Sequence, residues 1–280
     1  MMLDPITHRF LASAGNRGPL VLMYHSVTPG RARPQWPWAV SLPRFREHLA
    51  LLHSEGWATC TVSQMVAATE LPRKTVAITF DDGYADNLHA VDALQSHDMT
   101  ATFFIVTDGI GDVARWDTTE ADPRPMLGAS DLRHMRGLGM EIGAHTRRHA
   151  RLTTLGDAAV NEEVLGSKAA LEELLAERVQ SFAYPYGLYD DRSVAAVEGA
   201  AYTAACSTRS GVFTGENPYL IPRLSVFNDD GPARLARKLG LATNQGGWAA
   251  MARYYGHRLG SRLRPGQGTG RGDTAARNPR

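Results

Sequence analysis

The sequence predicts an α/β fold built around one sizeable core, and three observations support this class. Apolar runs alternate with helical patterns along the chain, as in a mainly parallel sheet whose strands are joined by crossover helices. The chemically distinctive residues follow these apolar runs, and α/β barrels keep their sites at the carboxyl-terminal ends of their strands. A chain of 280 residues, of which 43% are hydrophobic, is long enough for a single barrel-like domain.

The apolar runs and helical patterns define the expected elements. Strands are expected at residues 19–24, 75–80, 100–106, 140–143, 179–184 and 201–207. Helices are expected at 42–54, 85–97, 130–137, 157–177 and 190–199, with terminal helices at 230–241 and 247–259. Ser130, Asp157 and Asp190 are the expected N-caps, because a short polar side chain accepts a hydrogen bond from the first turn of a helix.

The expected strand at 75–80 ends in two adjacent carboxylates, Asp81 and Asp82, which Gly83 follows. A buried strand ordinarily stops in neutral turn residues. Adjacent carboxylates repel one another, and a cation, a shared proton or a catalytic task can compensate for that repulsion. Taken alone, Asp-Asp-Gly is most often an ordinary strand-to-loop turn, so a catalytic role needs a second observation.

A second cluster, His145-Thr-Arg-Arg-His149, places two histidines four residues apart, and one helical turn would bring both imidazoles to the same face. Pairs of solvated histidines on helices are common. Two histidines together with Asp82 nevertheless form a set of metal ligands that leaves positions open for water and substrate. The zinc motif His-Glu-x-x-His carries its general base between the histidines, whereas this cluster has no acidic residue there. The spare carboxylate of the Asp pair is the candidate base.

A third element, Ser181-Phe-Ala-Tyr-Pro-Tyr-Gly187, is an apolar run that breaks into a turn. Read in order with Thr79-Phe-Asp-Asp-Gly83 and the His145 to His149 cluster, it resembles the first three motifs of the polysaccharide deacetylases, carbohydrate esterase family 4 with the NodB homology domain. The earlier Leu22-Met-Tyr-His-Ser-Val27 resembles the branch that deacetylates bacterial exopolysaccharides. The resemblance spans residues 19 to 227, and it implies a distorted, incomplete (β/α) barrel.

The resemblance also implies roles for the motif residues. Asp82, His145 and His149 would bind a divalent metal, for which we expect zinc, and Asp81 would be the general base that activates water. Such a metal polarises the acetyl carbonyl while fixed donors stabilise the developing charge.

Two further residues complete the implied mechanism. The backbone N–H of Tyr186 would help to hold the oxyanion, and His25 would be the general acid for the departing amine. Without the family pattern, His25 would be interpreted as a core histidine at the end of the first strand.

Two departures from the family pattern suggest a decayed site as one further interpretation. Many members carry an arginine at the position of Ala183, where it orients the base, and the late Leu-x-His motif is missing because residues 221–227 contain no histidine. We therefore weigh three hypotheses. The first is a metal-dependent deacetylase that removes N-acetyl, or O-acetyl, groups from a saccharide. The second is an amidohydrolase of the same fold acting on a non-sugar amide. The third is a glycan-binding protein with a decayed site.

The chain is expected to comprise an amino-terminal extension at 1–18, a catalytic domain at 19–259 and a disordered basic tail at 260–280. The loop at 30–38 contains Trp36 and Trp38, which would either stack on a sugar ring or staple the loop to the core. A second long rim loop is expected from 108 to 125.

Composition bounds the partners and the compartment. A net charge of +1 gives no electrostatic reason to expect nucleic acid. Cys60 and Cys206 are expected to be buried small side chains, which fits a reducing compartment. No apolar stretch reaches membrane-spanning length, and residues 1–10 lack a basic region followed by an apolar core, so a cytoplasmic location is expected. Most exopolysaccharide deacetylases act outside the cytoplasm, which implies either an intracellular precursor as substrate or a preceding leader. The sequence predicts no oligomeric state.

Overall fold

The structure, a computed structural model, describes residues 3–116, 123–249 and 251. It divides into two compact units, Met1–Gly246 and Gly247–Arg280. In the second unit residues 248, 249 and 251 are helical, and the rest of the helix expected at 247–259, like the tail expected at 260–280, lies outside the described residues. The first unit contains the central sheet and the helices that flank it.

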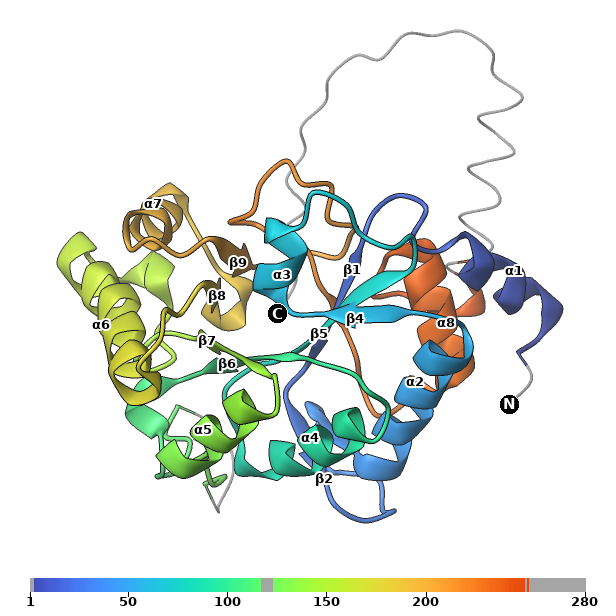
Figure 1. Cartoon of the computed structure of the whole chain (residues 1–280), viewed down its shortest axis with the longest axis horizontal. Coiled ribbons are helices and arrows are strands. Elements are labelled where there is room, and N and C mark those ends of the chain that lie inside the picture. Colours follow the sequence, from blue (N-terminus) through green and yellow to red (C-terminus); the bar gives the residue numbers. More distant parts are fainter. Residues whose placement is uncertain (1–2, 117–122, 250, 252–280) are drawn as a thin grey trace, which may run out of the picture. The chain divides into compact units, whose positions relative to one another are not determined.

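Parallel strands form the central sheet of this unit, in the order β10-β1-β5-β6-β7-β8-β9. The sheet is curled into a half-barrel with flanking helices, which confirms the predicted fold class (Figure 1). The strands are β1 (Leu20–Tyr24), β4 (Ala58–Cys60), β5 (Thr75–Phe80), β6 (Thr102–Ile105), β7 (Glu141–Ala144), β8 (Ser181–Ala183), β9 (Ala204–Cys206) and β10 (Leu224–Ser225).

Two features explain how the sheet curls. Strand β4 pairs with the first half of β5, through residues 75–77, while β6 pairs with the second half at 79–80. At the other end, Ile221 pairs with Cys206, the last residue of β9, and three residues later β10 pairs with Leu22 and Met23 of β1. The short segment from 221 to 225 therefore pairs with β9 at one edge of the half-barrel and with β1 at the other, and it spans the gap between these two strands.

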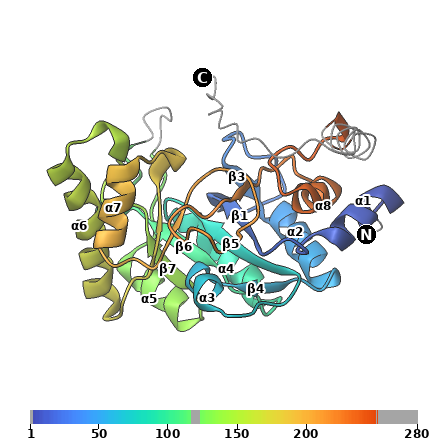
Figure 2. The same ribbon diagram turned by 90° about the horizontal axis from the view of Figure 1, so that it is seen from above.

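Helices surround the strands in the view of Figure 1, and Figure 2 shows β1, β5, β6 and β7 between α6 and α7 on one side and α2 and α8 on the other. Helix α1 packs against α8. The helices are α1 (Pro5–Ser13), α2 (Leu42–Ser54), α3 (Val62–Ala67), α4 (Leu88–Gln95), α5 (Ala129–Gly137), α6 (Asp157–Leu175), α7 (Asp191–Gly199) and α8 (Pro232–Leu241). A small parallel pair, β2 (Ser26–Thr28) and β3 (Ala39–Ser41), follows β1.

Alternation along the strands divides the core in two. In β1, the side chains of Leu20, Leu22 and Tyr24 belong to the large core that includes the helices. Val21 lies between them and belongs to a smaller cluster built from several strands and α3. Both cysteines lie in this smaller cluster as free, buried thiols, as predicted, and burial raises the pKa of each to about 12.

The N-cap predictions had mixed outcomes. Asp190 is the N-cap of α7, where its side chain accepts a hydrogen bond of 2.9 Å from the Ser193 N–H. The other two predictions are wrong. Helix α5 begins one residue before Ser130, and Gly128 is its N-cap. Helix α6 begins at Asp157 itself, and Gly156 is its N-cap. None of the helices in the described residues combines the length and hydropathy that a membrane crossing requires.

Candidate active site

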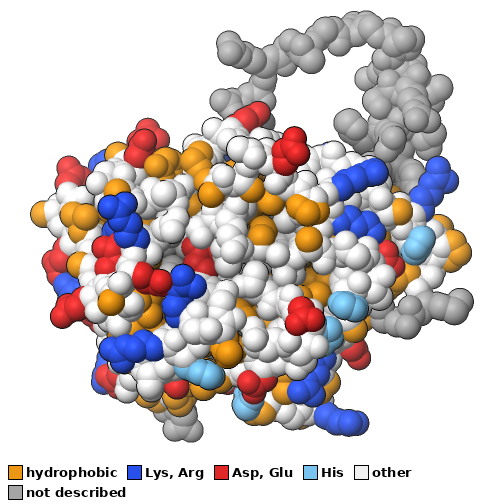
Figure 3. All heavy atoms as spheres, in the orientation of Figure 1, with side chains coloured by type: hydrophobic (Ala, Val, Ile, Leu, Met, Phe, Trp, Pro, Cys, Tyr) orange, Lys and Arg blue, Asp and Glu red, His pale blue; other side chains and the backbone are white. Residues whose placement is uncertain are grey.

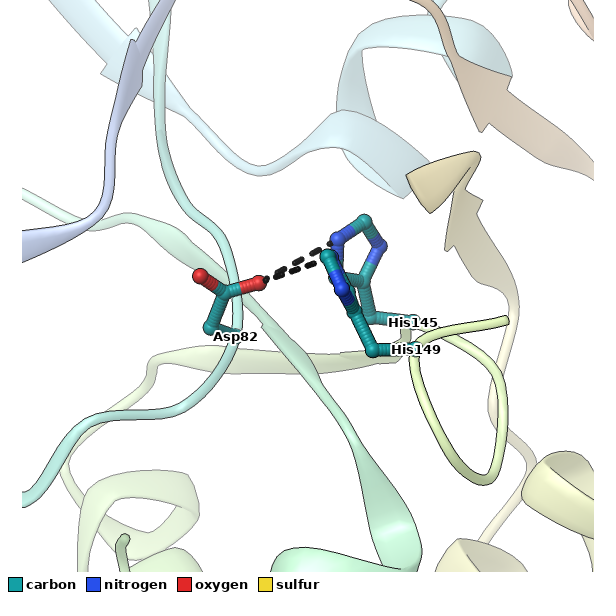
Figure 4. Close-up of side chains that lie close together, drawn as sticks. All are labelled: Asp82, His145 and His149. Carbon is teal, nitrogen blue, oxygen red and sulfur yellow. Dashed lines mark ion pairs between the residues drawn. The ribbon is translucent and has the colours of Figure 1, made fainter. Parts of the chain in front are cut away.

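Three buried side chains meet at the carboxyl-terminal edge of the sheet. Asp82 follows β5, and His145 and His149 follow β7, two strands away. The Asp82 Oδ1 atom lies 3.4 Å from Nε2 of His145 and 3.3 Å from Nε2 of His149. Figure 4 shows the carboxylate of Asp82 facing both imidazoles across the site. The structure thus brings together the three residues that the sequence analysis proposed as metal ligands.

The donor set suits a divalent metal. Asp82 Oδ1 is buried and has no hydrogen-bond partner within the part of the chain that the structure describes. Two ligand atoms on a tetrahedral ion at zinc distances lie about 3.4 Å apart, which is the spacing that Asp82 keeps from each histidine. Two imidazoles and one carboxylate are also the ligand types of open zinc sites. The residues therefore fit such an ion.

Hydrogen bonding orients the first histidine. Nδ1 of His145 lies 2.7 Å from the carbonyl oxygen of Ala183, so Nδ1 carries the proton and Nε2 presents its lone pair toward Asp82. Ala183 thus takes part through its backbone, although its side chain cannot orient a base. Burial lowers the pKa of His149 to about 4, which keeps that imidazole neutral. Burial acts to raise the pKa of Asp82, but the two imidazoles outweigh it and hold the carboxyl ionised.

The histidines do not lie on a helix, which corrects the expectation of a helical turn. Residues 145–149 form a loop in which Thr146 has a φ of 66° and His149 a φ of 58°. Both values lie in the left-handed region that non-glycine residues rarely adopt. Asp82, at 74°, and Tyr186, at 60°, share this conformation. Strained backbone gathers at functional sites, and here it turns the ligands toward one another.

The second carboxylate of the pair, Asp81, forms a buried bidentate ion pair with Arg223. The guanidinium Nη1 lies 2.6 Å from Oδ1 and Nη2 lies 2.8 Å from Oδ2. Arg223 is fully buried and also donates to the carbonyl oxygen of Ser207 and to Oγ1 of Thr79. Burial acts to raise the pKa of Asp81, but the charge of Arg223 outweighs it and lowers that pKa. The base candidate is therefore ionised and fixed in orientation.

Sequence reasoning missed Arg223, although it lies within residues 221–227, the segment that lacks the late histidine. Its signal was an arginine inside an otherwise apolar run, Ile221-Pro-Arg-Leu-Ser-Val-Phe227. Because this run pairs with Cys206 at one edge of the half-barrel and with β1 at the other, it carries the Arg223 side chain to Asp81. Ala183 stands where many family members carry the arginine that orients the base. In this chain Arg223, from another part of the sequence, contacts the base candidate Asp81 instead.

His25 follows β1 and is partly exposed, so it is not a fully buried core histidine. Its ring lies against Trp38, with centroids 4.5 Å apart, and Trp38 is 38% exposed. Burial lowers the pKa of His25, while the negative charges of Asp82 and Asp81 act in the opposite direction. The Asp81 N–H donates to the carbonyl oxygen of Tyr24 at 3.0 Å, so the residue before His25 lies beside the Asp pair.

Aromatic rings flank the second metal-ligand candidate. The His149 ring lies between Trp116 and Tyr186, with centroid distances of 5.1 and 4.5 Å. Tyr186 belongs to the short turn η4 (Pro185–Gly187), and Arg151 lies 4.1 Å above its ring. The structure therefore places Tyr186 beside His149, where its left-handed backbone forms part of the wall of the site.

The two tryptophans of the 30–38 loop have different surroundings. Trp36 packs edge-on against Tyr84 at 5.2 Å, and Arg124 lies 4.1 Å above its ring. Trp38 instead lies between His25 and Phe227. Beside them a pocket of about 500 Å³ is lined by residues 33–37, Ala39 and residues 227–229. Trp36 therefore anchors the loop, and Trp38 is an exposed ring that packs against His25.

Comparison with known proteins agrees with this geometry. The family model described as polysaccharide deacetylase matches residues 68–205, a range that contains Asp81, Asp82, both histidines and Tyr186. His25 and Arg223 lie outside the matched range.

Similarity extends further along the chain in individual relatives. YxkH of Bacillus subtilis, which carries the name polysaccharide deacetylase, is 28% identical over 212 residues, covering 74% of this chain and 70% of that protein. The poly-beta-1,6-N-acetyl-D-glucosamine N-deacetylase of Staphylococcus aureus is 23% identical over 208 residues, covering 69% of each chain. The structure of IcaB from Ammonifex degensii shares the fold, with a TM-score of 0.69, 24% identity, and coverage of 80% of this chain and 97% of IcaB. The chain belongs to the polysaccharide deacetylase family, and these likenesses support a hydrolase that deacetylates a polysaccharide.

Proposed function

We propose that this protein is a metal-dependent hydrolase that removes N-acetyl groups from a saccharide and releases acetate and a free amine. The observation that carries the proposal is the pair of adjacent carboxylates with separate partners. Asp82 faces two imidazoles, and Asp81 faces a fully buried guanidinium. These separate partners support the assignment of one carboxylate as a metal ligand and of its neighbour as a base.

The residues would divide the chemistry as follows. A divalent metal held by Asp82, His145 and His149 would lower the pKa of a water molecule toward neutrality and polarise the acetyl carbonyl. Asp81 would accept a proton from the attacking water, since its carboxylate is ionised and Arg223 fixes its orientation. The water oxygen forms a bond to the acetyl carbon, and the carbon–nitrogen bond then breaks.

Two other groups would act, one on the leaving nitrogen and the other on the oxyanion oxygen. The nitrogen leaves as an amine only after it gains a proton, and we assign that donation to His25. Burial lowers the pKa of His25, so its ring is neutral at rest. The proton that Asp81 takes from the attacking water would pass to His25 before the nitrogen leaves, which would return Asp81 to its ionised form. The backbone N–H of Tyr186 would donate to the developing oxyanion.

Several observations favour an N-acetylated saccharide of more than one unit. A relative that covers 69% of this chain is named for N-deacetylation of poly-N-acetylglucosamine. The pocket beside Trp38 combines an aromatic wall with amide and paired charged side chains, which suits a neutral sugar ring. The bidentate Asp81–Arg223 pair also counts against the glycan-binding hypothesis with a decayed site, because a pure binder has no use for an oriented base.

A substrate comparison tests the proposal. The purified protein loaded with zinc is incubated separately with N-acetylglucosamine oligomers, with an O-acetylated sugar ester and with an N-acetylated amine that lacks a sugar, and acetate is measured. The proposal expects release from the oligomers to be the fastest, and none from the oligomers with Asp82→Ala. Faster release from the sugar-free amide would favour the amidohydrolase hypothesis. Oligomer binding without any acetate release would favour the glycan-binding hypothesis.

A further inference from the structure

The loop between the two histidines is fastened through its backbone on both sides. On one side, the Thr107 N–H donates to the Thr146 carbonyl at 3.2 Å, and the Asp108 N–H donates to the Arg147 carbonyl at 2.9 Å. These donors belong to the turn η2 (Thr107–Gly109), which follows β6. The same segment also reaches the third ligand, because the Val106 N–H donates to the Asp82 carbonyl at 3.2 Å. Backbone N–H groups just after β6 thus bond both to Asp82 and to the loop that carries the two histidines.

The other side of the loop is held by one carboxylate. The Oε2 atom of Glu163, on α6, accepts hydrogen bonds from the N–H groups of Arg147 and Arg148, both at 2.9 Å. Its Oε1 atom accepts from Nε of Arg148 at 2.7 Å. Glu163 is 1% exposed, and a carboxylate is buried to this degree only where charged and hydrogen-bonding partners compensate for its lost hydration.

The neighbouring glutamate provides an internal comparison. Glu162 reaches the same two residues, but only their guanidinium groups, at 2.7 Å for Arg147 and 3.2 Å for Arg148. Its side chain is 51% exposed, so its ion pairs are screened by solvent. Adjacent residues of one helix therefore carry the same charge toward the same loop, and of these two glutamates only Glu163 has described hydrogen bonds to the loop's backbone.

The loop needs such a restraint because its conformation is unfavourable. Thr146 and His149 both have positive φ, and for the β-branched Thr146 this is a rare state that surrounding contacts must impose. Helix α6 approaches closely enough for this purpose, since a Cβ added to Gly166 would lie 2.5 Å from Cδ of Arg147. Released from Glu163, the two amides between the histidines would lose their buried acceptor, and the ligand spacing would no longer be fixed.

We propose that Glu163 is a positioning residue that presets His145 and His149 for the metal, an inference that rests on the metal site of the proposed function. It touches neither the metal nor the substrate. Its effect is on the ligand geometry, which metal affinity and the ligand field report directly. Partners of this kind, one step removed from the metal, typically change affinity by about 10- to 100-fold when they are mutated.

The test measures cobalt binding to the full-length chain. The dissociation constant for Co²⁺ is obtained by competition with a chelator, and the visible absorption spectrum of the Co²⁺ protein is recorded. Glu163→Ala should weaken binding by about 10- to 100-fold and alter the spectrum. Glu163→Asp, which keeps the charge but withdraws the oxygens by one methylene, should change both in the same direction. Glu162→Ala is the matched control and should leave both within twofold of wild type.

A conservative variant separates positioning from general damage. Glu163→Gln retains one oxygen that can accept from both backbone amides, so it should keep most of the affinity that Glu163→Ala loses. A folded Glu163→Ala or Glu163→Asp protein with the wild-type affinity and spectrum would overturn the inference while leaving the proposed function intact. Wild-type protein that binds no Co²⁺ or Zn²⁺ would instead overturn the proposed function, and the inference with it.

Discussion

At the scale of single residues, the adjacent carboxylates Asp81 and Asp82 illustrate how one turn creates two chemical environments. Asp82 has a φ of 74°, which turns the chain so that the neighbouring side chains diverge. One carboxylate reaches the imidazoles after β7, and the other reaches Arg223 before β10. Both carboxyl pKa values are held below their usual range, each by a different cationic or imidazole partner. Each carboxylate therefore has its own partner, which offsets the repulsion between the two negative charges.

Changing Arg223 tests whether it orients the base. Arg223→Met should lower the free energy of unfolding by about 3–5 kcal/mol, because it leaves the Asp81 charge buried without a partner. Arg223→Lys keeps the charge but not the two parallel hydrogen bonds, so it should be milder in urea unfolding while turnover still falls. The combination of Arg223→Met with Asp81→Asn should regain part of the lost stability. Additive losses in that double variant would contradict the ion-pair account.

His25 is tested by comparing two substrates. An amine departs poorly without a proton, whereas the phenoxide of an activated aryl acetate leaves with less help. His25→Ala should therefore lower N-deacetylation by roughly two to four orders of magnitude and affect the aryl ester far less, with unchanged metal content. Equal losses on the two substrates would point to a structural role for His25, and the acid would have to be another group.

Residue-level prediction succeeded where the chemistry is local in sequence. Asp81 and Asp82 are adjacent, and the two histidines are four residues apart, so the two motifs together indicated a shared task, although the helical turn expected for the histidines was wrong. Arg223 is separated from Asp81 by 142 positions, and only the pairing of residues 221–225 with both edges of the half-barrel brings it there. No local pattern reports such a pairing, although a charged residue in an apolar run was a usable signal.

At the scale of elements, the rim loop at 30–38 combines an anchor with an exposed ring. Trp38→Ala should raise KM for N-acetylglucosamine oligomers roughly tenfold, equivalent to about 1.4 kcal/mol of binding, while kcat changes little. Trp36→Ala should instead lower the free energy of unfolding by about 1–3 kcal/mol, because its contacts with Tyr84 and Arg124 hold the loop. Steady-state kinetics and thermal unfolding of both variants separate these effects. A Trp38 variant with unaltered KM would show that its exposed ring does not meet the substrate.

The elements themselves were predictable in proportion to their length and periodicity. Strand β5 and helix α2 have the predicted bounds, since a β-branched run and a full amphipathic helix give strong signals. Strands β2, β3, β4 and β10 have two or three residues each and were missed. Strands β8 and β9 are equally short, but each lies within a longer apolar run that was predicted as a strand. Helix α1 was also missed, although Asp4 caps it with a 2.9 Å bond to the Thr7 N–H and Pro5 follows.

At the scale of the whole molecule, charges of both signs are interspersed on the surface shown in Figure 3, in keeping with a net charge of +1. The charged groups that affect stability lie inside. His48 is fully buried, 3.0 Å from the hydroxyl of Tyr24 and 2.5 Å from the Asp230 carbonyl, and Asp230 pairs with the buried Lys238. Burial lowers the pKa of His48 from 6.5 to about 4.

This buried histidine predicts a pH dependence of stability. Between pH 6.5 and 4 the unfolded chain binds a proton at His48 that the folded chain does not, so stability falls as the pH is lowered through this range. The loss from His48 should reach about 2 kcal/mol at pH 5. Urea unfolding of the metal-free protein should show a shallower pH slope for His48→Gln than for wild type, whereas His53→Gln, on the exposed side of the same helix, should not differ. Parallel slopes for His48→Gln and wild type would contradict the assignment.

The central claim is that one bound metal, together with Asp81, makes this chain a deacetylase. The most direct measurement strips the protein of metal, titrates it with Zn²⁺ and follows both bound zinc and acetate release from N-acetylglucosamine oligomers. The account predicts that release rises with zinc and saturates at one ion per chain. It also predicts that Asp81→Asn binds the same single ion yet turns over roughly two to four orders of magnitude more slowly. Full activity in the stripped protein, or an Asp81→Asn variant as active as wild type, would contradict the account.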